Sequence, residues 1–109
     1  MPRPTQAFID LSALTHNLAV VRQYVPHSRI MAVIKADAYG HGLLPTASAL
    51  KAVDGFALLE IDAAISLRDA GFQQPILLLE GFFSIQELAL LEQYQLSAVI
   101  HHYEQVAML

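Results

Sequence analysis

The sequence contains no cysteine, so disulfide bridges and metal sites built on thiolates are excluded. Charged residues are scarce too, at 15% of the chain against a typical ~25%. The sequence has no run of ~18 apolar residues and therefore predicts no membrane-spanning helix. Its first residues, MPRPTQ, lack the apolar core of a secretory signal. We therefore expect a cytoplasmic protein.

The net charge of −4, with acidic and basic residues interspersed, gives no support for binding to nucleic acid or to anionic membranes. Apolar residues, in contrast, make up 55% of the 109 residues, above the usual ~45–50%. Such a chain has more apolar surface than a domain of this size can cover. We expect it to belong to a larger protein, to pair with a partner subunit, or both.

The most informative stretch is residues 29–42, which read RIMAVIKADAYGHG. Its apolar run, Ile30 to Ile34, predicts a strand that is buried on both faces, as in a parallel sheet. Lys35 ends this run, and a polar loop with two glycines follows. In α/β proteins the catalytic and binding residues gather at such carboxyl ends of strands.

Strand and helix patterns alternate along the rest of the chain. We predict further strands over residues 7–11, 55–59, 76–79 and 96–100, and helices over 13–24, 45–51, 61–70, 85–94 and from 104 onward. Ser12 is expected to cap the first helix, Gly71 to end the third, and Ser84 with Glu87 to form a capping box for the fourth.

Two architectures fit this alternation: an open doubly wound parallel sheet or a TIM-type (β/α)8 barrel. A complete barrel needs ~250 residues, so the parallel (β/α) units of this α/β chain would form about half of one. The sequence ends on apolar residues 107–109 without a helix cap. This end favours a truncated half-barrel, in which residues 1–109 are the first part of the barrel domain.

The chain has two lysines, Lys35 and Lys51. Lys51 lies near the end of a predicted helix, where a solvated cation is common. Lys35 follows three apolar residues at the end of a strand, and a lysine held in this way loses its proton more readily and can attack a carbonyl to form an imine. A lysine that simply extends to solvent at a barrel rim is the structural alternative.

Several polar residues accompany Lys35. Tyr39 could donate its hydroxyl to a phosphate, and Asp37 could tune the lysine or cap the loop. Glu80 follows a predicted strand and is a second carboxylate to consider at this rim. His41 could act as an acid, a base or a hydrogen-bond relay. His101 and His102 lack a nearby carboxylate pattern that would favour a metal site, and we predict no metal.

Residues 32–42, AVIKADAYGHG, closely resemble the pyridoxal-phosphate attachment signature of the alanine racemases. The lysine, the tyrosine and both glycines are in register over eleven consecutive positions. Two further stretches, residues 9–18 and 75–83, resemble the opening segment and third barrel strand of the same family. The resemblance extends over essentially the whole chain.

This resemblance implies a (β/α)8 barrel with a separate C-terminal β-domain, working as a homodimer on alanine with pyridoxal 5'-phosphate as cofactor. Lys35 would hold the cofactor as an internal aldimine and act as the catalytic base on one face of the α-carbon. Tyr39 would bind the cofactor phosphate, while Val33 and Leu79 would line the cofactor pocket. The usual signature has asparagine in place of Asp37, whose carboxylate would favour the ammonium form of a nearby lysine.

The resemblance also implies which parts of the enzyme this chain lacks. The base on the opposite face would be a tyrosine from the partner's C-terminal domain. Two arginines and the later phosphate-binding loops would also lie outside these residues. We therefore expect the full-length protein to interconvert L-alanine and D-alanine, and the 109 residues alone to be inactive.

Other functions share these features. A related racemase of serine, lysine or broad specificity would carry the same lysine loop. A non-enzymatic, single-domain homeostasis protein that binds pyridoxal phosphate also has a lysine after a buried strand, but with a different loop. The chain could also serve only as a half-barrel assembly module that pairs through its exposed sheet edges.

Overall fold

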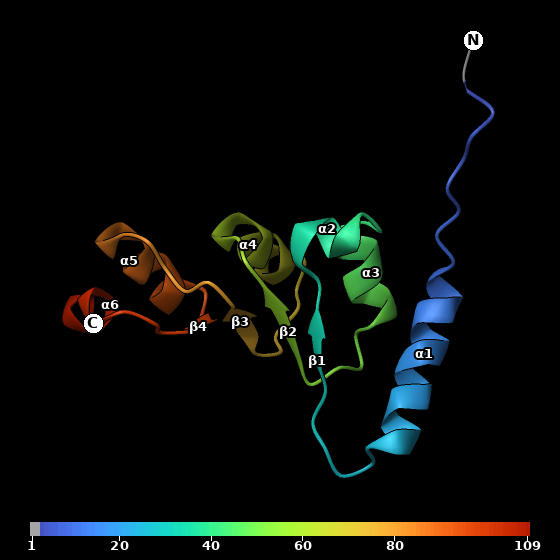
Figure 1. The fold of residues 1–109 in the computed structure, drawn as a ribbon, viewed down its shortest axis with the longest axis horizontal. Coiled ribbons are helices and arrows are strands. Elements are labelled where there is room, and N and C mark those ends of the chain that lie inside the picture. The colour runs from blue at the N-terminus through green and yellow to red at the C-terminus, as the bar shows by residue number, and fades with distance from the viewer. Residues whose placement is uncertain (1–2) are drawn as a thin grey trace.

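The computed structural model describes residues 3–109, which form parallel strands that alternate with helices (Figure 1). The strands are β1 (Met31–Val33), β2 (Gly55–Leu58), β3 (Ile76–Leu78) and β4 (Ser97–Ala98). The helices are α1 (Leu11–Tyr24), α2 (Lys35–Tyr39), α3 (Leu43–Ala49), α4 (Ile61–Asp69), α5 (Ile85–Gln93) and α6 (Tyr103–Met108). The predicted α/β class is confirmed.

The strand order decides between the two architectures. Each strand pairs in parallel with the next one along the chain, in the order β1-β2-β3-β4. A doubly wound sheet reverses its strand order at a switch point, whereas successive barrel strands do not. The four strands therefore have the order of consecutive strands in a barrel.

The sheet buries one face more fully than the other. Ala32, Phe56 and Ile76 lie in register across three strands and contribute to the hydrophobic core. In this core the rings of Phe56 and Phe72 pack edge-to-face, with 5.6 Å between the ring centroids. On the other face of β1, Met31 and Val33 remain 43% and 42% exposed. The prediction that this strand is buried on both faces is wrong for the described residues, because no second layer covers them there.

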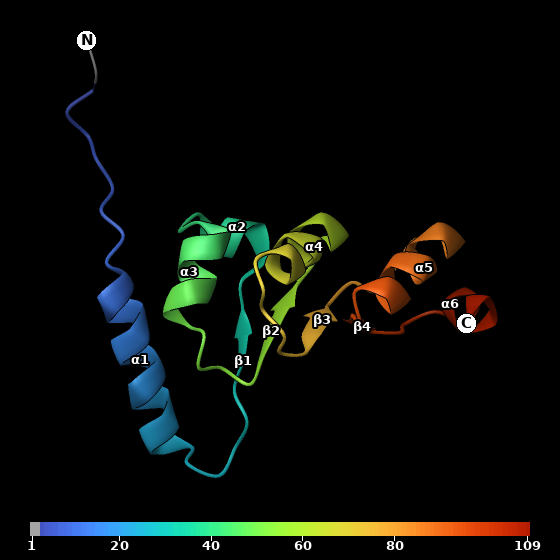
Figure 2. The ribbon, with the colours of Figure 1, turned by 180° about the vertical axis from the view of Figure 1, so that it is seen from behind.

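The overall shape is correspondingly open. The radius of gyration is 16.0 Å, whereas a compact domain of this length has a value of about 13 Å. Figure 2 shows that the segment before α1 runs away from the other elements. None of the helices that the structure describes is both long and apolar enough to cross a lipid bilayer.

The start of the chain differs from the prediction. Residues 3–10 form no strand, although one was expected over 7–11, and α1 begins at Leu11. A strand needs a neighbour for its backbone groups, and the described residues offer none here.

The cap of α1 also differs from the prediction. Asp10 replaces Ser12 as the cap, since its Oδ1 accepts hydrogen bonds from the Ser12 and Ala13 N–H groups at 3.0 and 3.3 Å. The hydrogen bond from the Ser12 hydroxyl lowers the pKa of Asp10 most, and the hydrogen bonds from these two N–H groups lower it further.

The later elements lie close to their predicted positions, with two corrections. Helix α5 begins after Ser84 as expected, but the Ser84 side chain makes no capping bond to the backbone; its hydroxyl donates to Glu87 Oε1 at 3.3 Å instead. Reciprocal capping occurs at α6, where the Glu104 N–H donates to His102 Nδ1 and the His102 N–H donates to Gln105 Oε1. The strand predicted over 96–100 is reduced to Ser97–Ala98.

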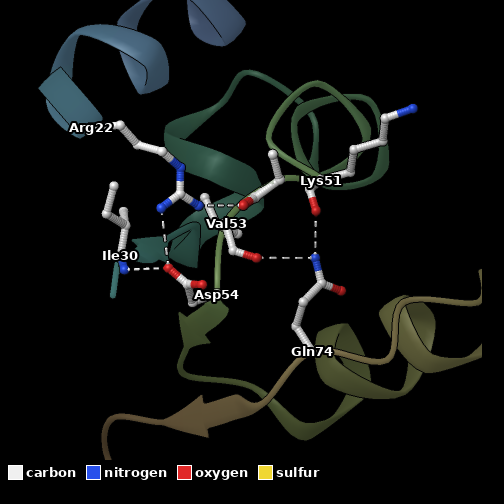
Figure 3. Close-up of polar contacts among 7 residues, drawn as sticks. Arg22, Ile30, Lys51, Val53, Asp54 and Gln74 are labelled. Carbon is white, nitrogen blue, oxygen red and sulfur yellow. Dashed lines mark hydrogen bonds and ion pairs between the residues drawn. The ribbon is translucent and has the colours of Figure 1, made fainter. Parts of the chain in front are cut away.

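A polar network fastens α1 to the amino-terminal end of the sheet (Figure 3). Asp54 Oδ2 accepts a hydrogen bond from the Ile30 N–H at 2.7 Å and lies 3.5 Å from Arg22 Nη1. Arg22 also donates to the Ala52 carbonyl, and Gln74 Nε2 donates to the Lys51 carbonyl at 2.8 Å. The Ile30 hydrogen bond, followed by the charge of Arg22, lowers the pKa of Asp54 below its usual value of 3.8.

This network predicts a component of acid sensitivity that belongs to Asp54. Because its folded-state pKa is lowered, ionised Asp54 stabilises the fold above pH 3.8, and this contribution is lost as the pH falls through the lowered pKa. Asp54→Asn should therefore flatten the fall in melting temperature between about pH 5 and pH 2. Thermal unfolding across this range measures it, with Asp69→Asn as the exposed control; equal slopes for wild type and Asp54→Asn would contradict the assignment.

Candidate functional site

Lys35 lies where the sequence predicted it, at the carboxyl edge of the sheet, with Ile34 between it and the end of β1. The ladder continues past the strand end, since the Ile34 N–H donates to the Ala57 carbonyl at 2.8 Å. Lys35 itself is half-buried. Next to it lies a cavity of about 310 Å³ lined by Ile34, Lys35, Ala36, Asp37, Leu43, Leu58, Leu59, Glu60 and Ala63. Lys35 therefore lines a space that a small molecule could enter.

The segment after Lys35 is a left-handed turn and not an irregular loop. Ala36, Asp37, Ala38 and Tyr39 have φ values of 52°, 54°, 55° and 57°. The Ala38 N–H donates to the Ile34 carbonyl and the Gly40 N–H to the Ala36 carbonyl, as in one turn of an α-helix. For L-residues this hand costs roughly 1–2 kcal/mol per residue. Such strain is typical of functional sites and requires support from surrounding groups.

Asp37 provides much of that support. Its Oδ1 accepts a hydrogen bond at 2.9 Å from the N–H of Leu43, the first residue of α3. Its backbone carbonyl accepts from Gly42 at 3.0 Å and from Gly40 at 3.1 Å. Within residues 3–109 the one ion pair joins Arg22 and Asp54, so the Asp37 carboxylate does not pair with the Lys35 amine.

The other predicted cofactor-binding residues lie outside the cavity lining. Val33, the last residue of β1, lies on the more exposed face of the sheet and is 42% exposed. Leu79 follows β3 and joins the ladder through its N–H, which donates to the Leu58 carbonyl at 2.8 Å. Tyr39 ends the left-handed turn and is 58% exposed. Their roles towards a cofactor remain predictions.

Glu60 is a cavity residue that the sequence reasoning missed. It follows β2 as Lys35 follows β1, and it lines both the cavity beside Lys35 and a second one that Glu80 also lines. The signal that could have found it is its position: a polar residue directly after the apolar run 55–59. Parallel strands bring such residues to one edge.

Three of the five histidines, His41, His101 and His102, have structural partners. His41 Nδ1 lies 2.9 Å from the Ala38 carbonyl, and His101 Nε2 lies 2.9 Å from the Glu80 carbonyl. His102 caps α6. In the described part of the chain, no three His, Asp or Glu side chains gather in a group that could hold a metal ion.

Comparison with known proteins gives a consistent family. A family model described as "Alanine racemase, N-terminal domain" matches residues 9–109. Two curated relatives, the alanine racemases of Nitrosospira multiformis and Nitrosomonas europaea, are each 66% identical over 109 residues, which is 100% of this chain and 30% of theirs. The chain thus spans less than a third of the length of these relatives.

A solved structure agrees with the sequence matches. The structure of alanine racemase from Acinetobacter baumannii superposes with a TM-score of 0.87 at 38% identity, covering 92% of this chain and 30% of that one. The four parallel strands and their helices therefore correspond to part of the barrel domain of that enzyme.

The left-handed turn predicts an unusual response to glycine. Glycine adopts positive φ without steric cost, so Ala36→Gly should leave the free energy of unfolding unchanged or raise it by up to about 1 kcal/mol. The same change at Ala89, an exposed position within the right-handed helix α5, should lower it by about 1 kcal/mol. Urea unfolding of the two variants compares these effects. A loss at Ala36 equal to that at Ala89 would show that the turn is not left-handed.

Proposed function

Because this chain belongs to the family of alanine racemase N-terminal domains, we propose that the protein it represents interconverts L-alanine and D-alanine with pyridoxal 5'-phosphate as its cofactor. The observation that carries the proposal is the position of Lys35, half-buried after β1 beside a cavity of about 310 Å³. The names of the curated relatives favour alanine over serine or lysine as the substrate. The cytoplasmic location remains a prediction.

The residues around Lys35 suit this cofactor. A primary amine is the group that reacts with an aldehyde, and Lys35 has no acidic partner within 4.0 Å among the described residues. Gly40 has φ +87° and nothing within 4 Å of the position that a Cβ would occupy, so a phosphate could approach its backbone. The exposed Tyr39 hydroxyl makes no hydrogen bond within residues 3–109 and would donate to that phosphate.

When bound, pyridoxal phosphate withdraws electrons from the α-carbon of an amino acid and makes its proton acidic. Lys35 would hold the cofactor and, when its amine is free, take or return the α-proton on one face. Val33 and Leu79 would contact the cofactor with apolar side chains. Asp37, whose carboxylate accepts the Leu43 N–H, would not pair with the amine of Lys35.

Racemisation also needs a proton donor and acceptor on the opposite face of the α-carbon. We expect this group to come from the partner subunit of a homodimer, outside the residues described. The uncovered face of β1, where Met31 and Val33 are exposed, supports a site that further chain must complete. The domain assignment, residues 1–109 as the first part of the barrel domain, belongs to this proposal.

The assignment of Lys35 predicts a specific chemical label. Full-length protein mixed with pyridoxal phosphate should show the absorbance of lysine-bound cofactor, and borohydride should fix the label on Lys35. Lys35→Ala should abolish the band and lower racemase activity by about 10²–10⁴-fold or more, whereas Lys51→Ala should keep both. Label on Lys51, or on no lysine, would refute the proposal.

The incomplete site predicts that the 109 residues alone do not racemise alanine. The fragment and the full-length protein would be incubated with cofactor and L-alanine, and D-alanine measured over time. The full-length protein should approach an equal mixture of both forms, while the fragment should stay at the background of free cofactor. Sustained D-alanine production by the fragment would disprove the need for an opposite-face group from elsewhere.

A further inference from the structure

We propose that Asp37 is a positioning residue, whose carboxylate fastens the left-handed turn Ala36–Tyr39 to α3 and thereby sets the relative directions of Lys35 and Tyr39. The inference rests on the proposed function, which assigns both of these side chains to the bound cofactor. Asp37 itself would touch neither cofactor nor substrate. Its effect is transmitted through the backbone of the turn.

The first step is the instability of the turn by itself. The left-handed conformation is unfavourable for every residue other than glycine, and here four consecutive non-glycine residues adopt it. Alanine and tyrosine, unlike asparagine and aspartate, also have no short polar side chain that could stabilise it locally. Without a hydrogen bond to a group outside the turn, residues 36–39 would return to right-handed or extended conformations.

The second step identifies the hydrogen bond that stabilises the turn. Among the four residues of the turn, Asp37 is the one whose side chain makes a hydrogen bond in the described structure. It reaches six residues along the chain to the Leu43 N–H at 2.9 Å, a group at the start of α3 that no carbonyl within the helix can satisfy. Helix α3 is anchored in turn, since Thr46 and Ala47 are buried. The carboxylate therefore joins a strained turn to a fixed element.

The third step connects the turn to the site. Lys35 and Tyr39 are four positions apart, and the left-handed residues 36–39 determine where Tyr39 lies relative to Lys35. Reversing the hand of residues 36–39 would carry Tyr39 around the axis in the opposite sense while Lys35 stayed attached to β1. The lysine and the tyrosine hydroxyl would then no longer meet one cofactor.

The hydrogen bond uses an acceptor oxygen and does not require the charge. Asp37→Asn keeps this oxygen, whereas Asp37→Ala and Asp37→Gly remove it. Glycine has the further property that it adopts the left-handed conformation without strain. Asp37→Gly therefore removes the fastening with little risk to folding, and it carries the test where Asp37→Ala fails to fold.

The experiment uses the full-length protein freed of cofactor. Pyridoxal phosphate is titrated into each variant, and the absorbance and circular dichroism of the lysine-bound cofactor are followed; thermal unfolding without cofactor is measured in parallel. Asp69→Asn and Asp69→Ala serve as matched controls, because Asp69 is exposed and its side chain makes no hydrogen bond within residues 3–109.

Loss of one hydrogen bond of ordinary strength should weaken the apparent affinity of Asp37→Ala and Asp37→Gly for pyridoxal phosphate by about 5- to 10-fold. The circular dichroism of the bound cofactor should fall, because its orientation is less fixed. Asp37→Asn should stay within about twofold of the wild type, and both Asp69 variants should be unchanged.

Two results would overturn the inference alone: wild-type affinity in Asp37→Gly, or an equal loss in Asp37→Asn and Asp37→Gly. A wild-type protein that forms no lysine-bound cofactor would overturn the proposed function and this inference with it. The two failures are therefore distinguishable.

Discussion

The site depends on one backbone constraint, the reversal of helical hand between Lys35 and Gly40. Such a reversal is unfavourable for each of the residues that make it, and it persists because neighbouring groups satisfy it. Three features stabilise the left-handed turn: the hydrogen bond of the Asp37 carboxylate, the backbone hydrogen bonds from Gly40 and Gly42, and the burial of Ala38. A side chain that must meet a cofactor at a defined angle gains from this rigidity, because a flexible loop would have to be ordered at each binding event.

The half-covered sheet gives the second constraint. Helices cover the face that carries Phe56, Ile76 and Leu78, and this produces the core of the described chain. The face of β1 that carries Met31 and Val33 has no such cover among the described residues. In a closed barrel this face is the interior, so the remaining strands would enclose the side of β1 that Met31 and Val33 expose here. The chain's 30% coverage of its curated relatives fits this arrangement.

Local patterns predicted the regular elements well and the irregular ones poorly. The strand over 55–59 was found because a continuous apolar run is a property of the segment itself. The helix over 61–70 was found in the same way, from its helical spacing of apolar residues and from Gly71, at φ +97°. The strand over 7–11 was wrong, because pairing depends on a neighbour that sequence periodicity cannot supply. The hand of residues 36–39 was missed, because three of the four residues give no local preference for it. Lys35 was located at the strand end, whereas Glu60 needed the parallel alignment of β1 and β2.

The central claim is that a left-handed turn presents Lys35 to pyridoxal phosphate at the carboxyl end of β1. A crystal structure of the full-length protein grown with the cofactor tests it most directly. The account predicts continuous electron density from Lys35 Nζ to the cofactor, with residues 36–39 at positive φ and Asp37 bonded to the Leu43 N–H. Cofactor joined to another residue, or a right-handed turn after Lys35, would contradict it.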